Sequence, residues 1–198
     1  VLSRCATHLP SHLVPCRVLR PERQLARGLA QDPVIAYLAH GEGRSGFVYV
    51  PRIGEAKRLA DRFNAAGVPA LAISSETELS VRDDALGDLA AGRVRLLVNV
   101  FCLTEGVDVP SASLCILARG VGHASTYLQM VGRILRPAPD KTDALLLDLP
   151  GVSHEHGEPC ESRVYALTGR AIRRVADAIT TCLHCGAAYE SGPLACPV

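Results

Sequence analysis

Short apolar runs alternate along the chain with segments whose apolar residues recur at the period of a helix. The apolar runs predict buried strands at 46–50 (GFVYV), 70–74 (ALAIS), 94–101 (VRLLVNVF), 113–118 (SLCILA) and 143–149 (DALLLDL). The periodic segments predict helices at 33–40, 52–66, 78–91 and 125–136. Runs that are apolar almost throughout are typical of parallel strands covered on both faces. The pattern therefore predicts an α/β fold, a parallel sheet with helices on both faces.

Helix-capping residues support this division into elements. Asp32 before Pro33 predicts a helix start, because a side-chain oxygen can accept from the first amides and proline suits the first turn. Thr77 is expected to cap the helix at 78–91, whose buried stripe would carry Val81, Leu86 and Leu89.

Length and composition are those of one main domain with a small appendage. The 198 residues, 48% of them hydrophobic, suffice to bury one full core. We expect a lead-in segment and connecting helix at 1–32, the main domain at 33–165, and a helix with a truncated zinc ribbon at 166–198. A net charge of +1 means that any nucleic-acid contact would depend on local arginines. With no run near the ~18 apolar residues of a membrane span and no export signal, we expect a cytoplasmic protein with reduced cysteines and no membrane partner.

The stretch YLQMVGRILRP, 127–137, carries three polar residues at helical spacing. Gln129, Arg133 and Arg136 are separated by four and three residues, so a helix would place them on one face. A guanidinium suits phosphate oxygens because it offers planar, paired donors and keeps its charge. Gly132, inside the predicted helix, costs about 1 kcal/mol relative to alanine and suggests that a ligand passes close to the backbone. A solvated arginine face explains this stretch equally well on its own.

A second polar stretch, TEGVDVP at 104–110, directly follows the predicted central strand. In parallel α/β sheets, ligands bind at the carboxyl ends of the strands. Gly106 would allow a close backbone approach, Asp108 could accept from a ribose hydroxyl, and Thr104 could donate to a phosphate. The alternative is a turn held by Asp108 and Pro110.

Three stretches in this order resemble the C-terminal RecA-like domain of superfamily two helicases, of the DEAD/DEAH-box and restriction-subunit-like types of bacteria and phages. FVYVPRIGEAKRLADRF is similar to that family's motif four, FCLTEGVDVP to motif five, and QMVGRILRP to motif six. The resemblance covers residues 33–150 and implies a RecA-like fold. One departure is Met130, which stands where many relatives have an arginine.

The resemblance implies a role for each group of candidate residues. The catalytic group would face the ATP phosphates, with the arginines as arginine fingers: Gln129, Arg133 and Arg136. The cofactor-binding group would lie beside the nucleotide: Gly106, Asp108 and Gly132. The nucleic-acid group would contact the backbone of the strand: Thr104, Arg52 and Ser74.

A complete motor also needs a phosphate loop and an acidic metal-binding motif, because these hold ATP with Mg. Neither motif occurs here, and the only lysines, Lys57 and Lys141, lack the phosphate-loop context. With a first residue, Val1, that is not methionine, the chain is interpreted as the second half of a motor. It would work with an N-terminal RecA-like lobe in the same protein and with nucleic acid, DNA favoured over RNA. On its own it is expected to be inactive.

The C-terminal tail carries a candidate metal site. Cys182 and Cys185 form a CxxC pair followed by glycine, and Cys196 with Pro197 resembles the start of a second pair. We expect these three thiolates to bind zinc, with the fourth ligand beyond Val198. The alternative is three free thiols.

Two other functions remain open for the whole chain. A catalytically silent module derived from a helicase lobe would bind nucleic acid or protein without a motor. A nucleotide-binding regulator would have no affinity for DNA or RNA. A phosphate loop upstream of residue 1 would favour the motor.

Overall fold

The computed structural model describes residues 2–4, 13–22, 28–103, 107–161, 179–181 and 188–190. The chain divides into two compact units, Val1–Glu161 and Ser162–Val198. In the second unit, strands β8 (Ile179–Thr181) and β9 (Ala188–Glu190) pair antiparallel. The helix predicted at the start of 166–198 lies outside the described residues as far as 178, and Ile179, which was expected on that helix, begins strand β8 instead.

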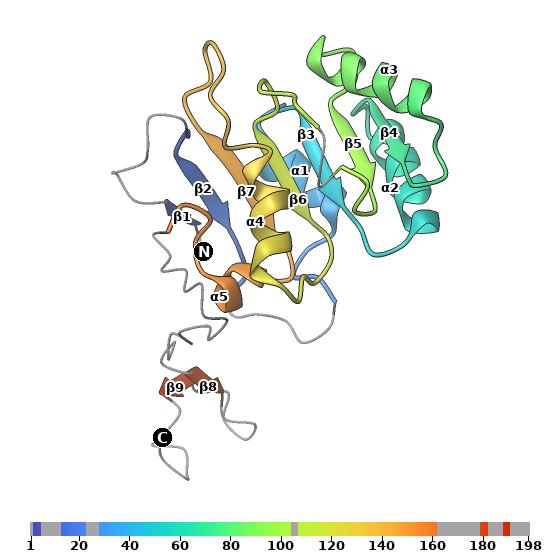
Figure 1. Ribbon diagram of the computed structural model, residues 1–198. Helices are drawn as coiled ribbons and strands as arrows, with labels where there is room; N and C mark the ends of the chain where they lie inside the picture. The colour runs from blue at the N-terminus through green and yellow to red at the C-terminus, as the bar shows by residue number, and fades with distance from the viewer. Residues whose placement is uncertain are drawn as a thin grey trace, which may run out of the picture. The chain divides into compact units, whose positions relative to one another are not determined.

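The first unit is built on a seven-stranded sheet with the order β1-β2-β7-β6-β3-β5-β4 (Figure 1). The strands are β1 (Leu2–Arg4), β2 (Cys16–Leu19), β3 (Gly46–Tyr49), β4 (Ala70–Ile73), β5 (Leu96–Asn99), β6 (Leu114–Leu117) and β7 (Ala144–Asp148). Strands β2 to β7 are parallel, and β1 is antiparallel to β2. All five predicted strands are confirmed, and β2 from within residues 1–32 extends the same sheet.

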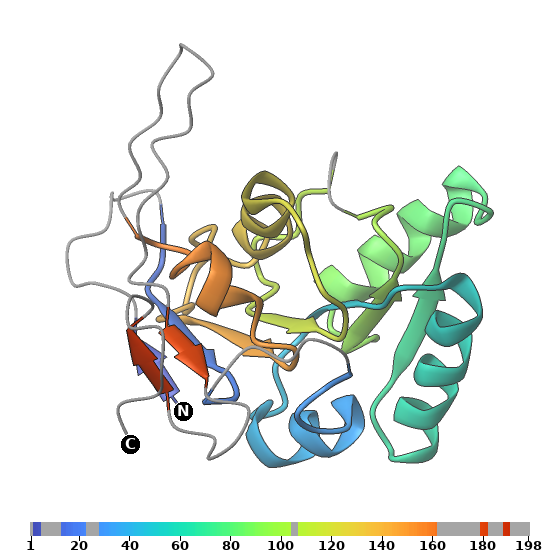
Figure 2. The same ribbon diagram turned by 90° about the horizontal axis from the view of Figure 1, so that it is seen from below.

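Helices cover both faces of this sheet, as predicted (Figure 2). They are α1 (Pro33–His40), α2 (Ile53–Ala65), α3 (Leu79–Ala90), α4 (Ala124–Gly132) and α5 (Val152–His156). Buried residues of α1 and α2 pack with one set of strand side chains, and those of α3, α4 and α5 with the opposite set. Consecutive residues of β3 show the reason: Phe47 belongs to one core cluster and Val48 to the other, because strand side chains alternate between faces. None of the described helices has the length and apolar character needed to cross a bilayer.

The capping predictions have mixed outcomes. The Asp32 carboxylate accepts from the amide of Val34 at 3.0 Å, which confirms the start of α1. The Thr77 cap is wrong: Glu78 is the N-cap residue of α3, and the Thr77 hydroxyl accepts from the amide of Ser74 at 3.0 Å. Val81 is 52% exposed rather than buried, since only the later turns of α3 reach the core through residues such as Leu89.

Candidate functional site

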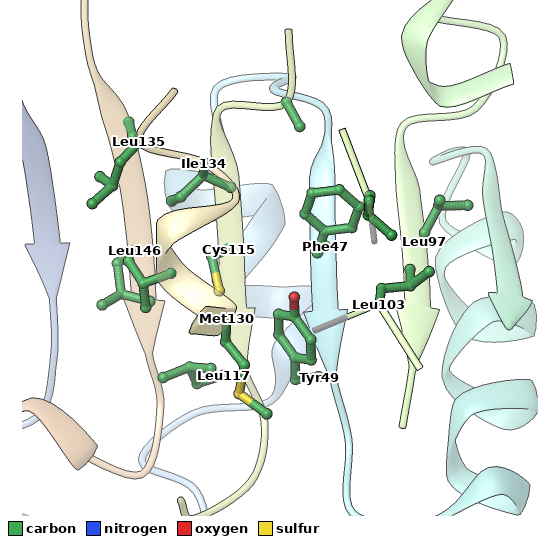
Figure 3. Packing of buried hydrophobic residues seen from close by; sticks show 14 of the residues in the cluster. Phe47, Tyr49, Leu97, Leu103, Cys115, Leu117, Met130, Ile134, Leu135 and Leu146 are labelled. Carbon is green, nitrogen blue, oxygen red and sulfur yellow. The ribbon is translucent and has the colours of Figure 1, made fainter. Parts of the chain in front are cut away.

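Helix α4 ends four residues earlier than predicted. Arg133 is its C-cap residue, and the chain continues in a tight turn in which Ile134 donates to Val131 and Leu135 to Gly132. Two causes act together. Arg136 precedes a proline, and a residue in that position disfavours the helical conformation. In addition, the core takes up two consecutive apolar side chains, Ile134 and Leu135. Figure 3 shows Ile134 and Leu135 packed with Met130 against the strands.

The tight turn still brings the two arginines together. Residues three apart eclipse one another in such turns, so Arg133 and Arg136 project to one side. Arg133 Nη1 donates to the carbonyl oxygen of Val107 at 2.6 Å, and Arg136 Nη1 donates to the same oxygen at 2.9 Å. Arg136 also pairs with the carboxylate of Asp108. Two stretches far apart in sequence therefore form one site.

The Arg136–Asp108 ion pair is open to solvent. The Asp108 side chain is 73% exposed and that of Arg136 is 36% exposed. Exposed pairs of this kind contribute about 0–1 kcal/mol to stability. Exchanging the carboxylate for a phosphate oxygen would thus cost the fold little, and the guanidinium geometry suits either anion.

Lys141 is also part of this site, although no sequence motif singles it out. Its Nζ donates to the carbonyl oxygens of Pro110 at 2.8 Å, Ala112 at 2.7 Å and Arg136 at 2.7 Å. Burial, together with the smaller effects of the nearby charges of Arg44 and Arg136, lowers the pKa of Lys141 to about 8. The ammonium group therefore links the loop after Val107 to the tight turn at 133–136, called the arginine turn below. Its position shortly after the two arginines could have suggested Lys141 as a site residue. No local sequence pattern, however, predicts which backbone carbonyls it contacts.

The other residues predicted near the nucleotide are placed as follows. Gln129 is exposed on α4. A Cβ added at Gly132 would meet no atom within 4 Å, so there is room beside the helix at this point. Met130 is fully buried, and its side chain therefore belongs to the core. Thr104 and Gly106 lie outside the described residues.

Two predicted nucleic-acid contacts lie at the carboxyl edge of the sheet. Arg52 follows β3, is 82% exposed, and lies 4.0 Å from the carboxylate of Glu55. Ser74 follows β4 and is buried; its hydroxyl accepts from the amide of Glu76 at 3.2 Å, and its carbonyl accepts from Arg82 at 3.2 Å. Arg52 thus offers an exposed charge, whereas the Ser74 hydroxyl serves the turn before α3.

The same edge carries a second pair that the sequence analysis missed. Phe101 was counted in the predicted strand, but β5 ends at Asn99 and Phe101 lies in the following loop. The Arg119 guanidinium carbon is 3.9 Å from the centroid of the Phe101 ring. Burial lowers the pKa of Arg119, which nevertheless stays charged at neutral pH.

The predicted zinc ligands Cys182, Cys185 and Cys196 lie outside the described residues. Strand β8 ends at Thr181, immediately before the first of them, and β9 begins at Ala188. Among residues that the structure describes, no group of three or more His, Cys, Asp or Glu could hold a metal ion. Of the described cysteines, Cys16 and Cys115 are buried, and Cys102 and Cys160 are partly buried.

The chain matches known proteins over this region. The helicase conserved C-terminal domain family matches residues 30–138, more than half of the chain. A 51.5 kDa protein of a Lactococcus phage is 30% identical over 135 residues, which are 68% of this chain and 30% of that protein. The DNA 3'-5' translocase XPB2 of Sulfurisphaera tokodaii is 38% identical over 77 residues, 39% of this chain and 17% of that protein. The chain thus spans less than a third of either relative.

A solved structure shows the same fold. The DEAD-box protein SrmB of E. coli, bound to the regulator of ribonuclease activity A, aligns with a TM-score of 0.53 at 21% identity. The alignment covers 67% of this chain and 82% of that chain. The solved structure shows the same fold, and the family match shows that the chain belongs to the helicase conserved C-terminal domain family.

Proposed function

We propose that the chain is the C-terminal motor lobe of an ATP-dependent nucleic-acid helicase or translocase. The observation that carries this proposal is the convergence of Arg133 and Arg136 on the carbonyl oxygen of Val107, beside Asp108. The guanidinium groups supply fixed positive charge for ATP phosphates, and the N-terminal RecA-like lobe of the same protein holds ATP with Mg. Closure of the two lobes would bring the arginines to the phosphates, and reopening after hydrolysis would move the lobes along a strand.

The roles of the remaining residues follow from their positions. Gln129 and Gly132 lie on α4, which ends directly before the turn that carries Arg133 and Arg136, and Gly132 leaves room for the nucleotide. Asp108 holds Arg136 in place while no phosphate is near, and Lys141 fixes the backbone of both segments. Thr104 and Gly106 are proposed to contact the strand and the nucleotide, respectively, on the motif resemblance alone.

Arg52 and Ser74 are proposed to contact the nucleic-acid backbone, with the exposed charge of Arg52 as the stronger support. We propose DNA rather than RNA, and the DNA translocase among the relatives supports this choice. A cytoplasmic location likewise stays a prediction from the sequence.

The test is steady-state ATPase, with saturating nucleic acid, of a protein that joins this chain to its N-terminal lobe. Arg133→Ala and Arg136→Ala should each lower turnover on the order of 10³- to 10⁵-fold, as removal of an arginine finger does. This equals roughly 4–7 kcal/mol of transition-state stabilisation. Arg136→Lys should recover little, because an ammonium lacks the planar fork.

A matched control is Arg93→Ala, because Arg93 also forms an exposed ion pair, with Asp88. It should leave turnover unchanged. Normal turnover in both finger variants would show that the arginines form a solvated surface, and the silent binding module would then be the better account.

We also propose that the tail binds zinc through Cys182, Cys185 and Cys196. The support is the CxxC spacing and the antiparallel strands β8 and β9 on either side of residues 182–187. A polypeptide that continues past Val198 should contain about one zinc per chain, since structural zinc takes four ligands. Metal analysis of wild type and Cys182→Ser checks this. Zinc-free wild-type protein, with no effect of the substitution on melting, would remove the proposal.

A further inference from the structure

The loop after β5 holds Phe101 in an uncommon backbone conformation. Its φ is +59°, in the left-handed region, where the Cβ atom of an ordinary side chain is crowded by the backbone. The following residues fix this turn: the Cys102 amide donates to the carbonyl of Val100 at 2.8 Å, its thiol donates to the carbonyl of Ile73 at 3.4 Å, and Leu103 is fully buried. The residue as a whole nevertheless remains 38% exposed.

This combination is not what a purely structural turn would require. Glycine or asparagine adopts a positive φ with little or no strain, so a phenylalanine at this position needs another reason. A large apolar ring held partly in solvent also gains little from burial. Strained residues whose surroundings hold them in place cluster at functional sites.

Arg119 stacks over one face of this ring. Its guanidinium carbon lies 3.9 Å from the ring centroid, and its Nε donates to the carbonyl of Gly120 at 3.2 Å. Strands β5 and β6, which precede the two residues, flank β3 in the sheet. Phe101 and Arg119 therefore meet across the carboxyl end of β3, from which the chain continues to the exposed Arg52.

We propose that Phe101 and Arg119 form a stacking platform for an unpaired base of a single-stranded nucleic acid. Aromatic rings and guanidinium planes both stack on bases, and such stacking tolerates any base because each has a π face. A base in a duplex is already stacked, so the platform would favour single strands. The inference rests on the proposed nucleic-acid function and adds to it a contact with the bases, beside the backbone contact of Arg52.

The chain contains no tryptophan, which makes a site-specific reporter possible. Phe101→Trp places the chain's single tryptophan on the platform and keeps an aromatic ring. Titration with a short oligothymidylate at low ionic strength should quench this fluorescence. An abasic strand of the same length, which offers phosphates without bases, should quench it much less. An oligouridylate in parallel shows whether the platform accepts RNA as well as DNA.

Affinities measured by anisotropy complete the test. Phe101→Ala should weaken binding to oligothymidylate about 5- to 140-fold, the range for loss of one stacked base, and leave binding to the abasic strand unchanged. Arg52→Ala should weaken both strands alike. Ile35→Ala, which removes a side chain that is 57% exposed on α1, is the control and should change neither. Melting curves show whether each variant is folded. If Phe101→Ala does not fold, the fluorescence of Phe101→Trp still tests the platform.

The outcomes separate this inference from the proposed function. If Arg52→Ala weakens both strands while Phe101→Ala has no effect and the reporter is not quenched, the stacking platform is wrong and the nucleic-acid function stands. An equal effect of Phe101→Ala on both strands, or equal quenching by duplex, also overturns it. If wild type binds neither strand, both the platform and the nucleic-acid function fail.

Discussion

Lys141→Met tests whether one ammonium group joins the two halves of the arginine site. Methionine keeps an unbranched apolar stem of similar length and removes the donor. The substitution leaves three carbonyl acceptors without their common partner, those of Pro110, Ala112 and Arg136. Because these carbonyls belong to both segments, the loop after Val107 and the arginine turn lose a shared anchor.

The size of the effect follows from the exposure of these bonds. A hydrogen bond from a charged donor contributes about 1.5–3 kcal/mol. The bond to Pro110 is exposed, so water replaces it, and the two part-buried bonds would give about 3–6 kcal/mol. Removing the charge also offsets part of this loss of stability, because burial disfavours the charged ammonium group. We expect a net loss of about 1–3 kcal/mol, which lowers the melting temperature by about 2–12 °C in a chain of this size.

The effect should also depend on pH. The pKa of Lys141 is lowered from its usual value near 10.5 to about 8 in the folded chain. Between these values the unfolded chain holds a proton that the folded chain has released, so stability from this group rises with pH. Lys141→Met lacks this rise. The stability difference between wild type and variant should therefore grow from about pH 7 to about pH 10.

Urea unfolding of wild type and variants at both pH values is the assay. Lys57→Met is the matched control, because Lys57 is the only other lysine and is exposed on α2. It should change stability by less than about 0.5 kcal/mol. Titrating thiols and tyrosines are common to all three proteins and cancel in the differences. If Lys141→Met is as stable as Lys57→Met, the ammonium does not anchor the site; a difference that shrinks with rising pH would refute the assigned pKa shift.

Two further predictions concern the core and the nucleic-acid edge. The Asp148 carboxylate, fully buried at the end of β7, accepts from the amides of Gly151, Val152 and Ser153 and from the Ser153 hydroxyl, at 3.0, 2.8, 2.7 and 2.6 Å. Asp148→Ala should cost about 3–5 kcal/mol in urea unfolding because it leaves buried donors unpaired, and a cost under about 1 kcal/mol would contradict this. The affinity of this chain for single strands should be weak and should decrease as the salt concentration rises, since one lobe neutralises few phosphates. Anisotropy at increasing salt concentration checks this, and tight binding that does not change with salt would exclude phosphate contacts.

The sequence by itself determined the layered fold. A strand covered on both faces must be apolar at consecutive positions, as Phe47 and Val48 show, and helices must be apolar on one side only. These demands are local in sequence, so the apolar runs and the Asp32 cap could be read directly. The motif residues also identified the family, because their order along the chain is itself sequence information.

The tertiary structure alone decided how the site is assembled. The end of α4 at Gly132 depends on which side chains the core accepts, which periodicity does not report. Arg133 and Arg136 share the Val107 carbonyl, and Lys141 holds three carbonyls of two segments. Such partners are backbone atoms of other segments, and a backbone carbonyl has no signature in the sequence.

The Phe101–Arg119 pair has the same origin. Each residue follows a different strand, and they meet only because β5 and β6 both lie beside β3. Strand order in a parallel sheet is set by crossover connections and packing between distant segments, rather than by the residues of any one strand. The sequence therefore determined which elements form, and the order of those elements in the sheet decided which side chains meet at its edge.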